Sequence, residues 1–231
     1  MNASVAIVTG SNGKTGQAIL RLLRDKGYTA VGFDVGAEGS GGFPYRQCDV
    51  TDHDQIVAAV AAVEREHGTI RLLVNNAGIW HGKGFLDIAP ADYDRTYAVN
   101  TRGPFFLTQE VARRLIAAGG GGVIVNLGSI VATAGSGVTD YGGSKAAIVN
   151  FTKSIAKPLG AHGIRVVAVS PGTINTAMGE AVPAELRNKL IASSALGRAA
   201  EPEEIAAAIV WLASPDAGYI TGATLDVNGG L

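Results

Sequence analysis

The stretch Ser4-Val-Ala-Ile-Val-Thr9-Gly10-Ser-Asn-Gly13-Lys-Thr-Gly16 joins a continuous apolar run to a turn that holds three glycines. A short apolar run closed by such a turn is typical of a strand buried on both faces, as in a parallel sheet. Apolar residues then recur at helical spacing from Ala18 to Leu23, and Gly27 ends the pattern. The stretch therefore predicts a strand, a tight turn and an amphipathic helix in direct succession.

The next strand, predicted at Thr29–Phe33, ends at Asp34, which lies 24 residues after Gly10. A strand, a glycine-rich turn, a helix and a second strand with a terminal acid form the arrangement that binds dinucleotides. The glycines let the backbone approach a pyrophosphate, whose charge the helix N-terminus stabilises. A carboxylate at position 34 can bind both hydroxyls of a ribose and would repel a 2′-phosphate; a simple turn role for Asp34 is the alternative.

The rest of the chain alternates apolar runs with helical patterns, which predicts an α/β fold with a parallel, doubly wound sheet. We expect about seven strands with helices on both faces, in one Rossmann-like domain that spans residues 1–231. Asn100 and Gly103 interrupt the longest helical stretch, and Pro158 is expected to end or kink the helix that contains it. A loop at about residues 173–196 is expected to close over a substrate. Further strands are predicted at Phe43–Cys48, Ile70–Val74, Val123–Leu127, Ile164–Val169 and Ala223–Val227, and helices at about Asp52–His67, Ala91–Ala118, Val138–Ala161 and Glu201–Ala213.

The composition excludes several classes of protein. The 231 residues carry a net charge of −1, which gives no sign of a surface for nucleic acid or an anionic membrane. The single cysteine, Cys48, cannot form an intrachain disulfide, and the four histidines are too scattered to suggest a metal site. No apolar run reaches the length of a membrane span, and no basic region or cleavage site comes before the first apolar run. We therefore expect no signal peptide and a cytoplasmic protein.

Polar residues and glycines gather where the predicted strands end. Ligands of doubly wound sheets bind beyond the carboxyl ends of the strands, so these residues are expected to form one site. For Asp49 the alternative is a turn carboxylate before the helix cap at Thr51 or Asp52. The residues at or just after strand ends are Gly10, Asp34, Asp49, Asn76, Ser129 and Pro171.

A second motif lies in Ser129-Ile-Val-Ala-Thr-Ala-Gly-Ser-Gly-Val-Thr-Asp-Tyr141-Gly-Gly-Ser-Lys145. The segment from Val138 onward has helical spacing, so Tyr141 and Lys145 are expected to share a helix face. A phenol has an ordinary pKa of about 10, and a nearby ammonium favours its deprotonated form. Such a pair can move a proton at an alcohol or carbonyl oxygen.

Together these residues resemble the short-chain dehydrogenase/reductase family, over nearly the whole chain from Val5 to Gly230. The glycine turn departs from the commonest family pattern, because the spacing of Gly10, Gly13 and Gly16 is closer to that of the longer, epimerase-like branch. The catalytic and C-terminal segments match the shorter branch. The matching signatures are Thr9-Gly10 with its glycine turn, Asp49, Asn75-Asn76-Ala77-Gly78, Asn100, Ser129, Tyr141 with Lys145, Pro171-Gly172 with Thr176, and Gly222 followed by Asn228-Gly229-Gly230.

The resemblance implies an oxidoreductase that interconverts a secondary alcohol and a ketone by hydride transfer with NAD. Tyr141 would be the general acid in reduction and the base in oxidation, Lys145 would lower its pKa and bind the nicotinamide ribose, and Ser129 would hydrogen-bond the substrate oxygen. Asn100 would interrupt its helix and hold a water that links Lys145 to solvent; a structural helix-breaker is the alternative. The implied cofactor contacts are Gly10, Asn12, Gly13, Lys14, Thr15, Gly16, Asp34, Asp49, Val50, Asn76, Ala77, Gly78, Tyr141, Lys145, Pro171, Gly172, Ile174 and Thr176.

Two alternatives to this function stay open. Lys14 near the phosphates is compatible with a 2′-phosphate, which gives an NADPH-dependent carbonyl reductase, whereas Asp34 followed by Val35 favours NAD. A catalytically idle nucleotide-binding sensor or scaffold is the other alternative, although Tyr141, Lys145 and Ser129 are all present. The expected partners are a small-molecule alcohol or ketone and further copies of the chain in a homodimer or homotetramer, with no nucleic acid, membrane or metal ion.

Overall fold

The computed structural model describes residues 4–135 and 137–231. Their strands form a single parallel sheet of seven strands in the order β3-β2-β1-β4-β5-β6-β7. This confirms the predicted doubly wound fold and puts a topological switch point between β1 and β4, where such sheets bind ligands. The strands are β1 (Val5–Thr9), β2 (Thr29–Asp34), β3 (Tyr45–Gln47), β4 (Ile70–Asn75), β5 (Gly122–Leu127), β6 (Ile164–Pro171) and β7 (Thr224–Val227).

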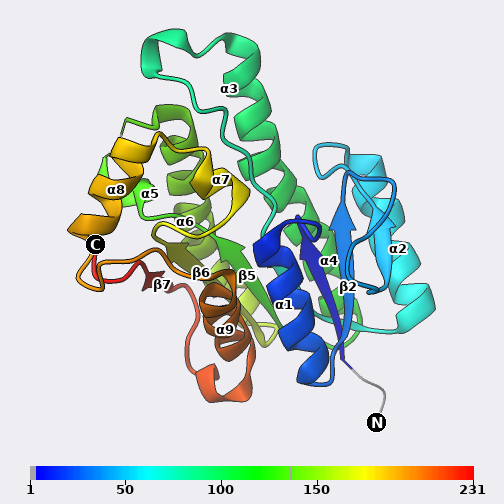
Figure 1. Ribbon diagram of the computed structural model, residues 1–231. Helices are drawn as coiled ribbons and strands as arrows, with labels where there is room; N and C mark the ends of the chain where they lie inside the picture. Colours follow the sequence, from blue (N-terminus) through cyan, green and yellow to red (C-terminus); the bar gives the residue numbers. More distant parts are fainter. Residues whose placement is uncertain (1–3, 136) are drawn as a thin grey trace.

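Helices cover both faces of the sheet (Figure 1). Successive side chains of β1 point to opposite faces: Ala6 and Val8 join the core under α1 (Lys14–Asp25) and α9 (Pro202–Ala213). Val5 and Ile7 join the core of the other face. Three long helices supply that second core, namely α2 (His53–His67), α4 (Gly103–Ala117) and α6 (Thr139–Gly160).

The long helical stretch predicted from Ala91 to Ala118 is divided, as Asn100 and Gly103 indicated. The helix α3 (Pro90–Tyr97) leads into one π-helical turn, η2 (Ala98–Arg102), and α4 follows. A π-turn widens the helical ring by one residue and often marks a functional position. Here the widened turn contains Asn100, which is 1% exposed.

Three helical features differ from the sequence-based expectation. The segment from 173 to 196 is more than a loop, since it contains α7 (Ala177–Glu180) and α8 (Ala184–Ser193). A short helix, α5 (Val131–Ala134), follows β5 and was not predicted. Pro158 does not end α6, which continues for two residues to Gly160, because a proline this close to the helix end removes only one late hydrogen bond. The other part of the prediction, a kink at Pro158, stays a prediction.

The remaining turns are short, namely η1 (Phe85–Asp87) and η3 (Pro215–Ala217). Within the described residues, no helix is both long enough and apolar enough to cross a membrane.

Candidate active site

The glycine turn after β1 is built for close approach of the backbone to a ligand. Gly10 has a φ of +64°, and a Cβ there would lie 2.9 Å from the Cα of Ala77. A Cβ at Gly16 would lie 2.8 Å from the Cα of Ser11 and would collide with the carbonyl oxygen of Gly10. Gly13, the N-cap of α1, has an extended backbone and offers no side chain to cap the helix. The amides of the first turn of α1 are therefore left without a side-chain cap, which fits a diphosphate at this helix N-terminus.

The end of β4 is attached to the same turn. The Asn76 side-chain amide donates to the carbonyl oxygen of Thr9 at 2.9 Å and to that of Gly10 at 3.2 Å. The buried Thr9 hydroxyl accepts from the backbone amides of Asn76 and Ala77 at 3.0 and 2.9 Å. These bonds fix the position of the predicted cofactor contacts Asn76, Ala77 and Gly78 relative to the glycine turn.

Asp34 faces the glycine turn from the end of β2. Its two carboxylate oxygens accept one backbone amide each, from Asn12 at 2.9 Å and from Val35 at 2.8 Å. The Asn12 side chain in turn donates to the carbonyl oxygen of Glu38 at 3.0 Å and accepts from the amide of Ser40 at 2.9 Å. Residues 35–45 contain no lysine or arginine, so this segment brings no cation to the side of Asp34.

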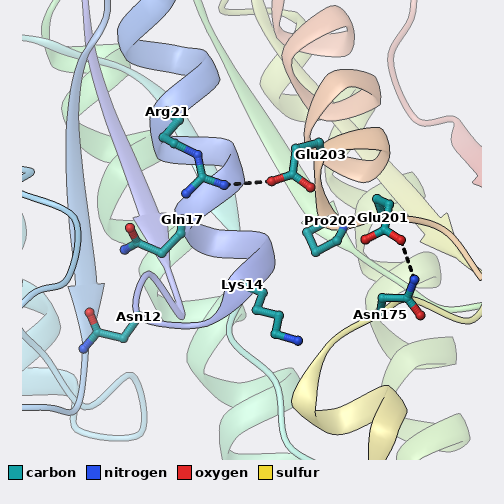
Figure 2. Close-up of a pocket in the computed structure, with 8 residues that line it drawn as sticks. All are labelled: Asn12, Lys14, Gln17, Arg21, Asn175, Glu201, Pro202 and Glu203. Atoms are coloured by element: carbon teal, nitrogen blue, oxygen red, sulfur yellow. Dashed lines mark hydrogen bonds and ion pairs between the residues drawn. The ribbon is translucent and has the colours of Figure 1, made fainter.

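Lys14 points away from Asp34. Its ammonium forms an ion pair with Glu180 of α7 at 2.9 Å. Figure 2 shows Asn12 on the side of β2 and the Lys14 side chain extending toward Asn175, across a pocket of about 440 Å³ between α1 and the start of α9. The suggestion that Lys14 assists a 2′-phosphate beside Asp34 therefore finds no support in this geometry.

Asp49 forms the hydrogen bonds of a turn carboxylate, the role named as its alternative, and its contact with adenine stays a prediction. One carboxylate oxygen accepts the Thr51 backbone amide at 2.9 Å and the Thr51 hydroxyl at 2.7 Å. Burial alone would raise the pKa of Asp49, but these hydrogen bonds outweigh it and lower the pKa. Its neighbour Val50 is buried against Gly103, where a Cβ would lie 2.8 Å from the Val50 carbonyl oxygen. The cap of α2 is Asp52, which accepts from the backbone amides of Asp54 and Gln55.

Tyr141 and Lys145 share one face of α6, and the Lys145 nitrogen lies 5.7 Å from the centre of the Tyr141 ring. Ser129, at the end of β5, reaches the Tyr141 phenol with its hydroxyl. Burial raises the pKa of Tyr141 to about 12, and the Ser129 contact lowers it only in part. Burial therefore has the larger effect on the phenol, and the expected lowering of the Tyr141 pKa by Lys145 stays a prediction.

Lys145 is 4% exposed, and burial lowers its pKa to about 8. Its ammonium donates to the carbonyl oxygen of Leu127 at 2.7 Å. A Cβ on Gly78 would lie 3.4 Å from the Lys145 nitrogen and 3.5 Å from the Oδ1 of Asn100. The glycine that ends the Asn75–Gly78 signature thus lies between the two side chains predicted to work together.

Asn100 uses its side chain for structure. Its amide nitrogen donates to the carbonyl oxygen of Ile79 at 2.9 Å and to the Ser144 hydroxyl at 3.1 Å, and its oxygen accepts the Ile79 amide at 2.8 Å. The Ser144 hydroxyl donates to the backbone carbonyl of Tyr141 at 2.7 Å. The sequence analysis did not single out Ser144, although it lies between Tyr141 and Lys145. Its spacing of four residues from Asp140 could have indicated that the two polar side chains share one helix face.

The segment after β6 closes the opposite end of the site. A Cβ on Gly172 would lie 3.0 Å from the Cα of Asn228, so the backbone there also needs a glycine. Ile174 pairs with Ala200 in an isolated parallel bridge. The Thr176 hydroxyl accepts the amide of Gly179 and so caps α7, while its own proton stays available to a ligand. Pro171 ends β6 in a buried position.

Comparison with known proteins decides the family. A family model described as Enoyl-(Acyl carrier protein) reductase matches residues 15–231. The chain is 36% identical over 243 residues to the 3-oxoacyl-(acyl-carrier-protein) reductase FabG of Thermotoga maritima, covering 100% of this chain and 98% of that protein. A mutant of a Serratia marcescens short-chain dehydrogenase/reductase has a TM-score of 0.89 and 34% identity, covering 98% of this chain and 97% of that one. The chain belongs to the short-chain dehydrogenase/reductase family.

Other members give a range of activities. The (3R)-3-hydroxyacyl-CoA dehydrogenase of Mus musculus is 35% identical over 254 residues, covering 100% of this chain and 97% of that protein. The structure of the Thermoplasma acidophilum aldohexose dehydrogenase has a TM-score of 0.91 and 30% identity, covering 100% of this chain and 94% of that one. As a short-chain dehydrogenase/reductase, the protein is an oxidoreductase of hydroxyl and keto groups on small molecules, with a nicotinamide cofactor.

The residues predicted for the site gather at five strand ends in this chain. The glycine turn, Asp34, the Asn76–Gly78 segment, Ser129 with Tyr141 and Lys145, and the Pro171–Thr176 segment lie along the carboxyl edge of the sheet. Asp49 and Val50 follow the edge strand β3. Among the described residues, no group of histidine, cysteine, aspartate and glutamate side chains has the arrangement of a metal site.

Proposed function

We propose that this protein interconverts a secondary alcohol and a ketone with NAD(H), using Tyr141 as the general acid and base. The observation that carries the proposal is the joint placement of Ser129, Tyr141 and the buried Lys145 at the carboxyl edge of the sheet, beside the glycine turn. The cofactor supplies the hydride chemistry, and the protein supplies position and electrostatics.

The proton chemistry follows from the pKa values of the site. Since the pKa of Tyr141 is about 12, the phenol carries its proton at neutral pH and can donate it to a carbonyl oxygen that gains alkoxide character. Ser129 adds a hydroxyl donor for the same oxygen. Lys145 donates one hydrogen bond to Leu127, and its other two N–H groups remain for a ribose hydroxyl and for water held near Asn100. In oxidation the same groups act in reverse, which needs a lower Tyr141 pKa than burial alone gives.

The preference for NAD rests on Asp34. Its carboxylate is held by two backbone amides, each oxygen keeps a lone pair for a ribose hydroxyl, and residues 35–45 offer no cation to a 2′-phosphate. A 2′-phosphate placed there would meet a fixed negative charge. Lys14, the one cation of the turn, is paired with Glu180 on the other side.

The names of the relatives indicate which substrates to test first. The panel for a first assay takes 3-oxoacyl and 3-hydroxyacyl thioesters and aldohexoses, which the relatives' names indicate, together with simple ketones and secondary alcohols. Family members commonly form oligomers. We propose a homodimer or homotetramer in which α4 and α6 pair between copies.

The decisive experiment combines two variants. Tyr141→Phe is expected to abolish turnover while NADH binding, followed by tryptophan quenching, stays unchanged. In the same titration wild-type protein is expected to bind NADH at least about tenfold more tightly than NADPH, a gap of about 1.4 kcal/mol, and Asp34→Ala is expected to narrow that gap. Binding that favours NADPH would make the protein an NADPH-dependent reductase. NADH binding without turnover on the whole panel would make it a nucleotide sensor or scaffold and would refute the enzymatic proposal.

A further inference from the structure

The first turn of α6 carries a second stripe of side chains next to the reactive one. Tyr141 and Lys145 are four residues apart, and so are Asp140 and Ser144, each one position earlier. Residues four apart share a face of a helix, so two parallel stripes run along the start of α6. Asp140 is 5% exposed and Ser144 is fully buried.

Asp140 is attached to α3 by a buried hydrogen bond. The Thr96 hydroxyl, which is fully buried, donates to a carboxylate oxygen of Asp140 at 2.8 Å. The two residues are 44 positions apart in the sequence, so the bond joins two separate helices. A buried carboxylate is expensive unless it is compensated, and here the Thr96 donor and the positive end of the α6 dipole compensate it. The N-cap, Val138, has no side chain that can cap the helix.

Ser144 attaches the same turn at its other end. Its hydroxyl accepts from Asn100 in the π-turn and donates to the backbone carbonyl of Tyr141. The Thr101 hydroxyl also donates to the backbone carbonyl of Ser144 at 3.2 Å. Between the two attachments, a Cβ on Gly143 would lie 2.5 Å from the Tyr97 hydroxyl oxygen, so a larger residue at position 143 would require the Tyr97 side chain to move.

We propose that Asp140 and Ser144 are positioning residues, which hold the first turn of α6 against α3 and the π-turn and thereby fix Tyr141 relative to Ser129. The proposal rests on the proposed function, because it assigns these residues to the geometry of proton transfer. Proton transfer requires the phenol within hydrogen-bond reach of the reacting oxygen, and a displacement of about 1 Å costs on the order of 100-fold in rate.

The test removes the Thr96 donor with Thr96→Val and uses Thr152→Val as the matched control. Thr152 is also fully buried, lies in the same helix as Tyr141, and accepts a hydrogen bond from Asn126 at 2.9 Å, but three turns beyond Tyr141. Both variants are expected to lower the melting temperature to a similar extent. Only Thr96→Val is expected to lower kcat, by about 10- to 100-fold, with unchanged affinity for NADH, and to speed amide hydrogen exchange of residues 139–145.

Two further variants keep the test independent of folding. Asp140→Asn retains an acceptor for Thr96 and is expected to keep kcat within about threefold of wild type, whereas Asp140→Ala is expected to reproduce the loss seen in Thr96→Val. Ser144→Ala is expected to lower kcat while NADH still binds.

Each outcome decides something. Equal loss of kcat in Thr96→Val and Thr152→Val would overturn the proposal, as would faster exchange of residues 139–145 with an unchanged kcat. If the wild-type protein binds NADH but converts no substrate, the proposed function fails first and the positioning role fails with it; the exchange measurement would then still show whether Thr96 anchors the turn.

Discussion

Raising the pH from 8 to 9 is expected to stabilise the folded protein, because of Lys145. Burial lowers the pKa of this ammonium from its ordinary 10.5 to about 8. In the unfolded chain the Lys145 ammonium titrates near its ordinary pKa of 10.5. Between pH 8 and pH 9 the unfolded state therefore binds more protons than the folded state. Stability therefore rises with pH in this window.

The magnitude depends on the size of the shift. At about 1.36 kcal/mol for each pKa unit, keeping the buried ammonium charged costs about 3 kcal/mol at pH 7. Of this cost, about 1 kcal/mol is recovered between pH 8 and 9. Cys48 and Tyr141 act in the opposite direction, because burial raises the pKa of Cys48 from 9.0 to about 12 and that of Tyr141 from 10.0 to about 12. The Cys48 thiol of the unfolded chain already loses protons between pH 8 and 9, which offsets about a third of the Lys145 gain, and both groups act more strongly above pH 9. Their deprotonation in the unfolded state lowers stability as the pH rises further.

Urea unfolding at pH 7, 8 and 9 measures the effect as a shift in the midpoint. The comparison uses wild type, Lys145→Met, and Lys153→Met, which removes an exposed lysine from the same helix. Wild type and Lys153→Met are expected to gain stability from pH 8 to 9, and Lys145→Met is not. The pH dependence is a sharper measure than the absolute stability, because Lys145→Met also leaves the Leu127 carbonyl without its donor, at about 1–3 kcal/mol. A wild-type profile that matches Lys145→Met would refute the reasoning.

Two further predictions concern the glycine turn. Gly16→Ala is expected to destabilise the fold by about 3 kcal/mol or more, because its Cβ has no space beside Gly10 and Ser11. Gly13→Ala should keep the wild-type melting temperature, because its Cβ would lie 3.5 Å from the Gly10 oxygen. Equal melting temperatures for the two variants would contradict the geometry. Lys14→Gln is expected to leave the ratio of NADH to NADPH affinity unchanged within about twofold, because the Lys14 ammonium faces Glu180. A selective loss of NADPH binding in the quenching titration would show that Lys14 reaches the 2′-phosphate.

The sequence predicted most of the sheet because each strand is a short apolar run with a clear end. It also predicted a helix cap at Thr51 or Asp52, of which the structure uses Asp52, and an interruption at Asn100. The helix α8 was missed for a physical reason: it buries none of its residues, so it shows no apolar stripe to set a helical period. The helices α5 and α7 have four residues each, too few to show a period at all.

The site shows the same division between local and long-range information. Tyr141 and Lys145 were predictable as a pair because their relation is local, four residues along one helix. The partners that set their environment come from elsewhere in the chain: Leu127 binds the Lys145 ammonium, and Thr96 binds Asp140. A sequence spacing of 44 residues carries no information on such a contact until the helices are packed.

The Tyr141 pKa depends on both kinds of information. The ammonium of Lys145 by itself would lower the pKa of Tyr141, but the surrounding protein also acts on the phenol. In the folded chain the same packing that brings the two side chains together also removes water from both, which raises the phenol pKa and lowers the ammonium pKa. Both shifts favour the uncharged forms. Under the proposed function, Tyr141 therefore begins a reduction with its proton in place, while the equilibrium between alcohol and ketone is set by the substrate and the cofactor.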